Sequence, residues 1–234
     1  ASGSMLALFS EKIENMVVSS ADLSNSDKTE GFLKNSKPFK KGDFSGGFLH
    51  AGVSELTMAC IMNGMALHGG IIPVCGTFFV FSDYMKPAFR MSALMRQQVI
   101  YVWTHDAFRV GEDGPTHQPV EHELQVRLME ALKNHKGKNS MLVLRPADVD
   151  ETTVAWKMAL ENQDTPTALI LSRQNVKNLP RKESKYNEAL GATKGAYIVK
   201  DCEGTADVIL LASGSEVSTL VAATELLESR ANLN

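Results

Sequence analysis

Several short motifs that mark common nucleotide-binding or hydrolytic sites are missing from this sequence. It has neither a G-x-x-x-x-G-K-[ST] stretch nor a G-x-G-x-x-G stretch after a strand, which argues against a P-loop and a dinucleotide-binding turn. Gly214-Ser215 lacks the second glycine of a serine-nucleophile elbow. No H-E-x-x-H occurs, and His117 and His122 stand five residues apart, so we expect no zinc site.

Cysteine is scarce, and neither long apolar runs nor a strong net charge occur. Cys60, Cys75 and Cys202 are widely separated and flanked by apolar residues, which predicts buried free thiols in a reducing compartment rather than a disulfide framework. No segment approaches the roughly 20 apolar residues that span a bilayer, and the N-terminus lacks the features of a signal peptide. With a net charge of only −3, we expect a cytoplasmic protein that binds neither nucleic acid nor membrane.

The sequence does contain a regular alternation of strand-length apolar runs and helix-length segments. This alternation predicts an α/β fold with a mostly parallel sheet flanked by helices. The expected strands are residues 16–19, 47–50, 71–76, 99–104, 141–145 and 168–172. The expected helices are residues 5–15, 53–68, 84–97, 120–134 and 151–161. Residues 21–43 are polar with little periodicity, which predicts a long functional or mobile loop.

A charged stretch with a proline, at residues 178–187, indicates a domain boundary. Beyond it we expect a strand at 196–200, a strand at 208–212 and a helix at 216–230, a unit that lacks the further strands needed to bury its faces. We therefore expect one domain over residues 1–182 and a partial second α/β unit over residues 183–234. The chain starts inside one helical pattern and stops just after another, so we also expect that both ends are cut.

An acidic residue and an aromatic stripe are candidates for chemistry. Glu55 is the only acidic residue of the apolar segment 53–68, which we expect to be buried. It is either an ordinary carboxylate in the first turn of a helix or a buried acid/base group. Phe78, Phe81 and Tyr84 recur every three residues, a spacing that would place them on one helical face. They could pack in the core or stack on a flat heteroaromatic ligand.

Polar side chains also gather where expected strands end. The run G-E-D-G-P-T-H-Q-P-V-E at 111–121 follows a strand and forbids regular structure. It is either a solvated turn or a ligand loop, and it carries Asp113 and His117. His105 ends the preceding strand and Arg173 ends another. Because open α/β sheets bind ligands at the carboxyl ends of their strands, this set favours a site for a phosphate or a polyol.

Eight separate motifs, in order along the chain, resemble those of transketolases, which are thiamine-diphosphate enzymes. The resemblance runs from about Ser20 to the end of the chain. The motifs are S-A-D-L (20–23), H-A-G-V-S-E (50–55), L-H-G-G (67–70), T-F-F-V-F-S-D-Y (77–84), T-H-D (104–106), G-E-D-G-P-T-H-Q-P-V-E (111–121), P-T-A-L-I-L-S-R-Q-N (166–175) and G-S-E-V (214–217). Chance does not explain so many motifs in one order.

The resemblance implies a binding site for the cofactor thiamine diphosphate within a thiamine-diphosphate-binding fold. By this likeness Glu55 is the catalytic carboxyl that hydrogen-bonds the aminopyrimidine ring of the cofactor and promotes its activating tautomer. Phe78, Phe81 and Tyr84 are the aromatic pocket around that ring.

The same resemblance implies how a sugar phosphate is held. Ser26, His105 and Arg173 would bind its phosphate, and Asp113 would contact a hydroxyl. His117 would lie near the reacting carbons as a second catalytic residue. The implied reaction transfers a two-carbon ketol unit from a ketose phosphate to an aldose phosphate in the pentose phosphate pathway, in a homodimeric enzyme.

Departures from the family pattern limit what this chain can do alone. The G-D-G motif with a downstream Asn, which holds the diphosphate and Mg or Ca, is absent and by the resemblance belongs to an N-terminal domain. We therefore expect no metal-binding residue here and an inactive isolated chain. Asn25-Ser26-Asp27 replaces the more familiar P-S-N. The alternatives are a dihydroxyacetone synthase, with formaldehyde as acceptor, and the C-terminal subunit of a split transketolase that needs a separate diphosphate-binding subunit.

Overall fold

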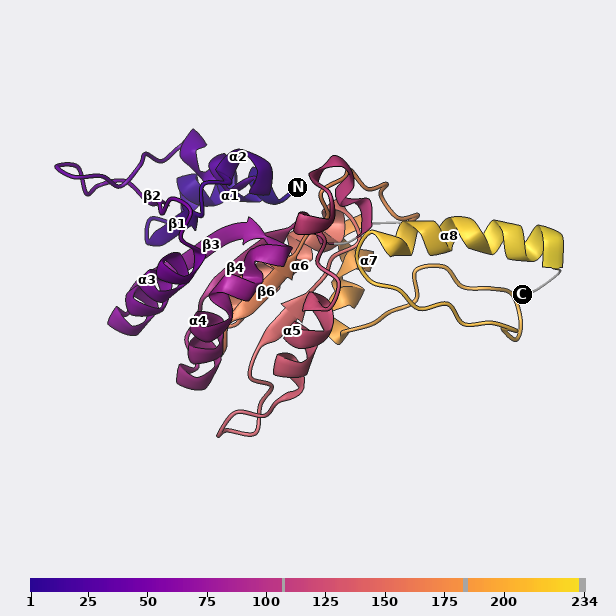
Figure 1. Cartoon of the computed structure of the whole chain (residues 1–234). Coiled ribbons are helices and arrows are strands. Elements are labelled where there is room, and N and C mark those ends of the chain that lie inside the picture. Colours follow the sequence, from indigo (N-terminus) through magenta and orange to yellow (C-terminus); the bar gives the residue numbers. More distant parts are fainter. Residues whose placement is uncertain (107, 183–184, 232–234) are drawn as a thin grey trace.

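The chain folds around one parallel sheet, seen in a computed structural model that describes residues 1–106, 108–182 and 185–231. Within these residues the strand order is β2-β1-β3-β4-β6-β5, and every pairing is parallel (Figure 1). The strands are β1 (Met16–Ser20), β2 (Phe48–His50), β3 (Ile72–Phe78), β4 (Ile100–Thr104), β5 (Leu142–Leu144) and β6 (Thr167–Ile170). The predicted fold class is confirmed, since six of the expected strands occur where the apolar runs placed them.

Helices cover both faces of the sheet because the strands are apolar on both sides. They include α1 (Ser2–Lys12), α3 (Glu55–His68), α4 (Ser82–Met95), α5 (His122–Ala131) and α6 (Val149–Glu161). Helices α3, α4 and α5 pack on the face that carries Tyr101 and Trp103, whereas α1 and α6 pack on the face that carries Ile100 and Val102. This division follows from the alternation of side chains along β4.

The segment at 21–43 is more ordered than its composition predicts, so the expectation of a long irregular loop is wrong for much of it. It holds α2 (Ser24–Asp27) and a 3₁₀ helix, η1 (Thr29–Lys34). The buried carboxylate of Asp27 accepts hydrogen bonds from Ser20 Oγ at 2.6 Å and from the backbone N–H of Thr29 at 2.8 Å. A Cβ at Gly76 of β3 would lie 2.5 Å from Thr29 Cγ2, so only glycine allows this close approach.

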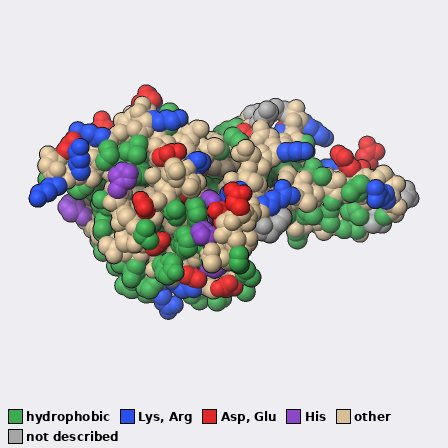
Figure 2. Space-filling model, turned by 45° about the horizontal axis from the view of Figure 1, so that its top comes forward, with side chains coloured by type: hydrophobic (Ala, Val, Ile, Leu, Met, Phe, Trp, Pro, Cys, Tyr) green, Lys and Arg blue, Asp and Glu red, His purple; other side chains and the backbone are tan. Residues whose placement is uncertain are grey.

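The C-terminal part corrects a second expectation. Residues 196–200 and 208–212 form no strand, because a strand needs a hydrogen-bonded neighbour and neither segment pairs with a described strand. The part contains α7 (Lys185–Ala189), a 3₁₀ helix η5 (Leu190–Lys194), α8 (Glu216–Leu226) and a π-helical turn η6 (Leu227–Ala231). Whereas α7 and η5 pack against α6, residues 195–231, the C-terminal arm, project from the main body, as seen at the right of Figure 1 and Figure 2. The expected helix at 216–230 is present.

The exposure of α3 corrects two further expectations. The helix is not buried all round, since Leu56, Ile61 and Leu67 are exposed on its outer face. The three cysteines are free, as predicted, but only Cys75 is buried, whereas Cys60 lies exposed on α3. No helix among the described residues is long and apolar enough to cross a membrane.

Candidate functional site at the strand ends

The centre of the site lies where β3 and β4 end side by side. Phe78 is the last residue of β3 and pairs in register with Thr104, the last residue of β4. The chain therefore leaves both strands at the same edge of the sheet. The ring of His105 stacks on Phe78, with centroids 3.6 Å apart. The backbone of His105 turns sharply here, with φ of 62°, a left-handed conformation that a non-glycine residue adopts only when its surroundings hold it.

An aromatic wall continues from this pair along one side of the site. Phe78 and Phe81 stack with centroids 5.9 Å apart, and His117 stands edge-on to Phe81 at 5.3 Å. Tyr84 lies 6.1 Å from Phe81 and is exposed. The three aromatic residues do not share one helix, as their spacing suggested, because Phe78 ends β3, Phe81 lies in a 3₁₀ turn, η2 (Phe79–Phe81), and Tyr84 lies in α4.

Charged groups beside this wall come from the end of β6 and from the glycine-rich loop after β4. Arg173, which follows β6, donates from Nε to Asp113 Oδ2 at 3.0 Å and from Nη2 to Glu112 Oε1 at 2.9 Å. Asp113 Oδ2 lies 3.8 Å from Nε2 of His105. The loop is formed by the turns η3 (Phe108–Asp113) and η4 (Pro115–His117), so the run at 111–121 is a shaped loop with charged partners.

The electrostatics of the site leave His105 neutral at pH 7. Burial lowers the pKa of His105 to about 4. The negative charge of Asp113 works in the opposite direction, while Arg173, His117 and Lys28 add to the lowering. A neutral imidazole in this position can donate from one ring nitrogen and accept at the other.

Glu55 begins α3 at the same edge of the sheet. Its side chain is buried although it carries no hydrogen bond to another described side chain. Helix α3 packs beside α4, whose first residues follow Phe81, so the carboxyl and the aromatic wall come from neighbouring helix starts. A carboxyl at the start of a helix that packs beside the helix of exposed Tyr84 fits a planar ring that carries a nitrogen donor.

Ser26 stands apart from the residues above. It is exposed in α2, and its Oγ donates to Asn25 Oδ1 at 3.0 Å. The influence of Lys28 on His105 shows that this part of the chain lies near the site, but no hydrogen bond joins Ser26 to the described site residues.

The sequence reasoning assigned no role to two charged residues near the site. Glu112 was not expected to bind Arg173. Asp106, directly after His105, forms a buried ion pair with Arg145, with Oδ2 2.9 Å from Nη2. The T-H-D motif was the only feature of the sequence that drew attention to Asp106. Nothing in the sequence indicated that Asp106 pairs with an arginine 39 residues away.

One trio of metal-ligating residue types occurs among the described residues, formed by Asp83, Glu121 and His122. Nε2 of His122 lies 3.1 Å from the carbonyl oxygen of Val80 and 3.1 Å from Asp83 Oδ2. Two oxygen acceptors at this distance favour a proton on Nε2, and the other ring nitrogen, Nδ1, lies 3.8 Å from Glu121 Oε2.

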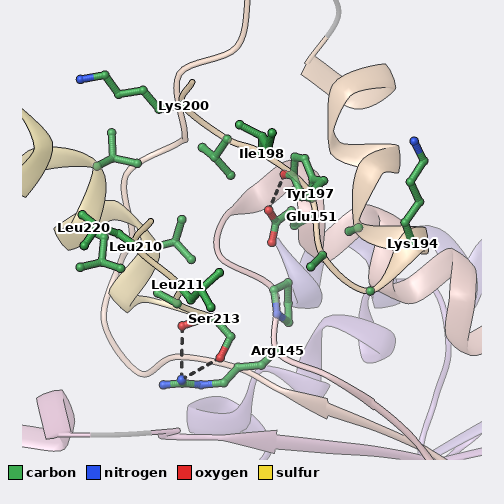
Figure 3. Close-up of a pocket in the computed structure, with 18 of the residues that line it drawn as sticks. Arg145, Glu151, Lys194, Tyr197, Ile198, Lys200, Leu210, Leu211, Ser213 and Leu220 are labelled. Atoms are coloured by element: carbon green, nitrogen blue, oxygen red, sulfur yellow. Dashed lines mark hydrogen bonds between the residues drawn. The ribbon is translucent and has the colours of Figure 1, made fainter. Parts of the chain in front are cut away.

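A cavity of about 950 Å³ lies away from the strand ends. It is bounded by the edge strand β5, α6, α8 and the segment 192–213 (Figure 3). Its lining includes the apolar side chains of Ile198, Leu210 and Leu211. The cavity therefore lies between the edge of the sheet and the C-terminal arm, apart from the aromatic and charged site.

Together, the parallel sheet and its strand-end cluster define the class of protein. This is an α/β domain with a carboxyl, an aromatic wall and His, Asp and Arg side chains at one edge of its parallel sheet.

The chain belongs to the transketolase family. Residues 1–178 match the family model of the transketolase pyrimidine-binding domain, and residues 195–234 match that of the transketolase-like C-terminal domain. The transketolase of Halalkalibacterium halodurans is 49% identical over 228 residues, which are 97% of this chain but 32% of the relative. The chain thus spans about a third of the length of the curated relatives it matches.

Solved structures agree with this assignment. A transketolase from Pichia stipitis in complex with sedoheptulose-7-phosphate superposes with a TM-score of 0.84 at 38% identity, over 98% of this chain and 32% of that one. A protein described as a split gene transketolase, inactive beta4 tetramer, superposes with a TM-score of 0.57 at 27% identity, over 76% of this chain and 52% of that one.

Proposed function

We propose that this chain is the pyrimidine-binding part of an enzyme that transfers two-carbon ketol units between sugar phosphates with the help of thiamine diphosphate. The observation that carries this proposal is the strand-end cluster, in which His105 stacks on Phe78 and His117 stands edge-on to it, while Asp113 and Arg173 lie beside them. Such a cluster combines a surface for a flat ring with donors and acceptors for a phosphorylated polyol.

Glu55, Phe78, Phe81 and Tyr84 are the residues that would hold the aminopyrimidine ring of the cofactor. The buried carboxyl of Glu55 would accept a hydrogen bond from a ring nitrogen or share its proton, and the exposed face of Tyr84 leaves room for the ring. When bound, thiamine diphosphate supplies a carbon nucleophile that carries the ketol unit. We assign its diphosphate and a Mg or Ca ion to residues outside this chain.

His105, His117, Asp113, Arg173 and Ser26 are assigned to the sugar phosphate. Neutral His105 can donate to a phosphate or hydroxyl oxygen, and Arg173 supplies positive charge, although a phosphate would have to compete with Asp113 for its guanidinium. Asp113 would accept from a substrate hydroxyl, and His117 would donate to or accept from a group beside the reacting carbons. The sugar phosphate bound to the Pichia stipitis relative supports this substrate class.

We further propose that the whole protein is a cytoplasmic homodimer and that residues 1–182 and 183–234 belong to different domains. The free cysteines support a reducing compartment. The outer faces of α3, α4 and α5 support association, because apolar side chains are exposed on each of them. They are Leu56, Leu67, Leu94, Leu124 and Leu128. Sedimentation of the full-length protein as a monomer would contradict the dimer.

Replacement of Glu55 by Ala in the full-length protein tests the catalytic assignment. We expect loss of ketol transfer from a ketose phosphate to ribose 5-phosphate, with far-UV circular dichroism unchanged. Glu161→Ala, at an exposed position of α6, is the matched control and should keep full activity. Near-normal turnover by Glu55→Ala would refute the assignment. The same assay with formaldehyde as acceptor separates a dihydroxyacetone synthase from a transketolase.

The isolated chain should be inactive because it holds no proposed diphosphate or metal contact. For the same reason the isolated chain should bind thiamine diphosphate weakly. Calorimetry with thiamine diphosphate and magnesium measures this binding, and a micromolar dissociation constant would contradict the expectation. A second candidate is the C-terminal subunit of a split transketolase, which the likeness to the split gene structure favours. The length of the complete reading frame decides between this candidate and a single long chain.

A further inference from the structure

Arg145 connects the site to the C-terminal arm. It follows β5, and its side chain is almost fully buried. Nε and Nη2 both donate to Asp106 Oδ2, at 3.1 and 2.9 Å. Since Asp106 is the residue after His105, this pair ties the backbone that carries the His105 imidazole to Arg145.

The same guanidinium also contacts residues just before and at the start of α8. Nη1 donates to the carbonyl oxygen of Ser213 at 3.2 Å and to its Oγ at 3.3 Å (Figure 3). Glu216 Oε2 lies 2.7 Å from Nη2 as an ion pair. The backbone N–H of Gly214 donates to the carbonyl oxygen of Arg145 at 3.0 Å. Arg145 is therefore clamped between the loop after β4 and residues 213–216.

Gly214 makes this clamp possible. Its φ is +61°, and a Cβ at this position would lie 2.7 Å from Nε of Arg145. Any side chain here would push the guanidinium away from its partners, besides straining the backbone.

Opposite charges also hold Arg145 in place. One guanidinium faces three carboxylates, those of Asp106, Glu123 and Glu216, with the Glu123 contact at 3.4 Å. Burial opposes the charge on Arg145, but the carboxylates outweigh it and raise the pKa of the guanidinium. Burial raises the pKa of Asp106, against the pull of Arg145. Asp106 thus depends on Arg145, because a buried carboxylate without its cation is costly.

His105 needs such an anchor. Its left-handed backbone is strained, and strain of this kind persists only where the surroundings over-determine the conformation. Thr104 holds the N-terminal side through the sheet, and Asp106 holds the C-terminal side through Arg145.

We propose that Arg145 is a positioning residue that couples the docking of residues 213–216 to the orientation of His105. When these residues clamp the guanidinium, Asp106 is fixed and the His105 ring stays buried against Phe78. When they leave, the loop after β4 relaxes and the ring moves out into solvent. That His105 then serves a sugar phosphate rests on the proposed function, whereas the coupling itself does not.

The experiment follows the six histidines of the 234-residue chain by imidazole NMR during a pH titration. A spectrum of His105→Asn assigns the His105 signal. In Gly214→Ala we expect the pKa of His105 to rise from about 4 toward the usual 6.5, by at least about one unit, because the ring becomes solvated. Gly195→Ala is the matched control, since Gly195 has a φ of +90° in the same arm but no atom near its Cβ position. It should leave the titration unchanged.

A second pair of variants tests the arginine itself. Arg145→Lys keeps the charge but cannot serve Asp106 and Ser213 together, so it should raise the pKa of His105 as Gly214→Ala does. Arg127→Lys, which also borders Glu123 but not Asp106, should not. The result is read only from variants that retain the amide spectrum of the folded chain. If Gly214→Ala or Arg145→Lys retains that spectrum and the pKa of His105 is unchanged, the coupling is overturned. An equal shift in Gly195→Ala overturns it too. No ketol transfer enters the readout, so this result and the outcome for Glu55→Ala are independent.

Discussion

Replacement of Arg181 by Met should destabilise the chain more than the loss of any ordinary surface ion pair. The guanidinium is almost fully buried and pairs with Asp148, the N-cap residue of α6, through both terminal nitrogens. It also lies 3.3 Å from Asp150 Oδ2. Removal of one partner leaves a buried carboxylate without its cation, which typically costs about 3–5 kcal/mol.

The contacts that remain place the expected loss near the lower end of this range. Asp148 would still accept hydrogen bonds from the backbone N–H groups of Glu151 and Leu179, each at 2.9 Å. We therefore expect a loss of about 3 kcal/mol in the free energy of unfolding. With a slope of about 1–3 kcal/mol per molar urea, the midpoint should fall by about 1 M or more. Urea titration followed by the fluorescence of the two buried tryptophans, Trp103 and Trp156, measures it.

Acid should remove the difference between the wild type and Arg181→Met. Burial alone would raise the pKa of Asp148, but hydrogen bonds from Arg181 and from two backbone N–H groups lower it. The stabilisation is therefore present above the unfolded pKa of about 3.9 and is lost as pH falls through the lower folded value. Lys157→Met, in an exposed pair with Glu161, is the control and should cost far less than Arg181→Met, because water screens the exposed pair. A loss in Arg181→Met no larger than in this control would refute the reasoning.

Two further perturbations have definite expected outcomes. Because burial lowers the pKa of His105 to about 4, the unfolded chain binds its proton first, and stability should fall by up to about 3 kcal/mol as pH drops from 6.5 toward 4. Urea unfolding of His105→Asn should lack this part of the pH dependence, and an identical profile would contradict it. Gly76→Ala should lose about 1–3 kcal/mol in calorimetric unfolding, since its Cβ would meet Thr29 Cγ2 at 2.5 Å. Gly64 in α3 has open space at its Cβ position, so Gly64→Ala should leave the free energy of unfolding unchanged or raise it by up to about 1 kcal/mol. Equal losses in the two variants would exclude the contact with Thr29 as the cause.

The sheet of the first domain was predictable because its signal is local. An apolar run such as β4 can be buried on both faces only in the middle of a covered sheet, and the helical segments between the runs supply the cover. The expected strands at 196–200 and 208–212 failed for the opposite reason. Their apolar residues have strand character, but a strand also needs a neighbour to pair with, and pairing is not local.

The candidate site divides in the same way. His105, Asp113 and His117 follow one strand, so their proximity was foreseeable from the chain. That Arg173 would bind Asp113 and Glu112 was not, because this contact joins residues 60 and 61 positions apart. The assignment of all these residues to a cofactor and a substrate stays a prediction.

The sequence by itself determined the fold class, the family and the identity of the residues at the strand ends, because each depends on patterns and motifs that are complete within short stretches. Only the tertiary structure decided which charges meet, how deeply each residue is buried and that His105 is neutral. It alone joined Asp106 through Arg145 to Ser213 and Glu216. Those properties arise from distances between segments far apart in the chain, and burial and electrostatic energies are set by distance in space, not by position in sequence.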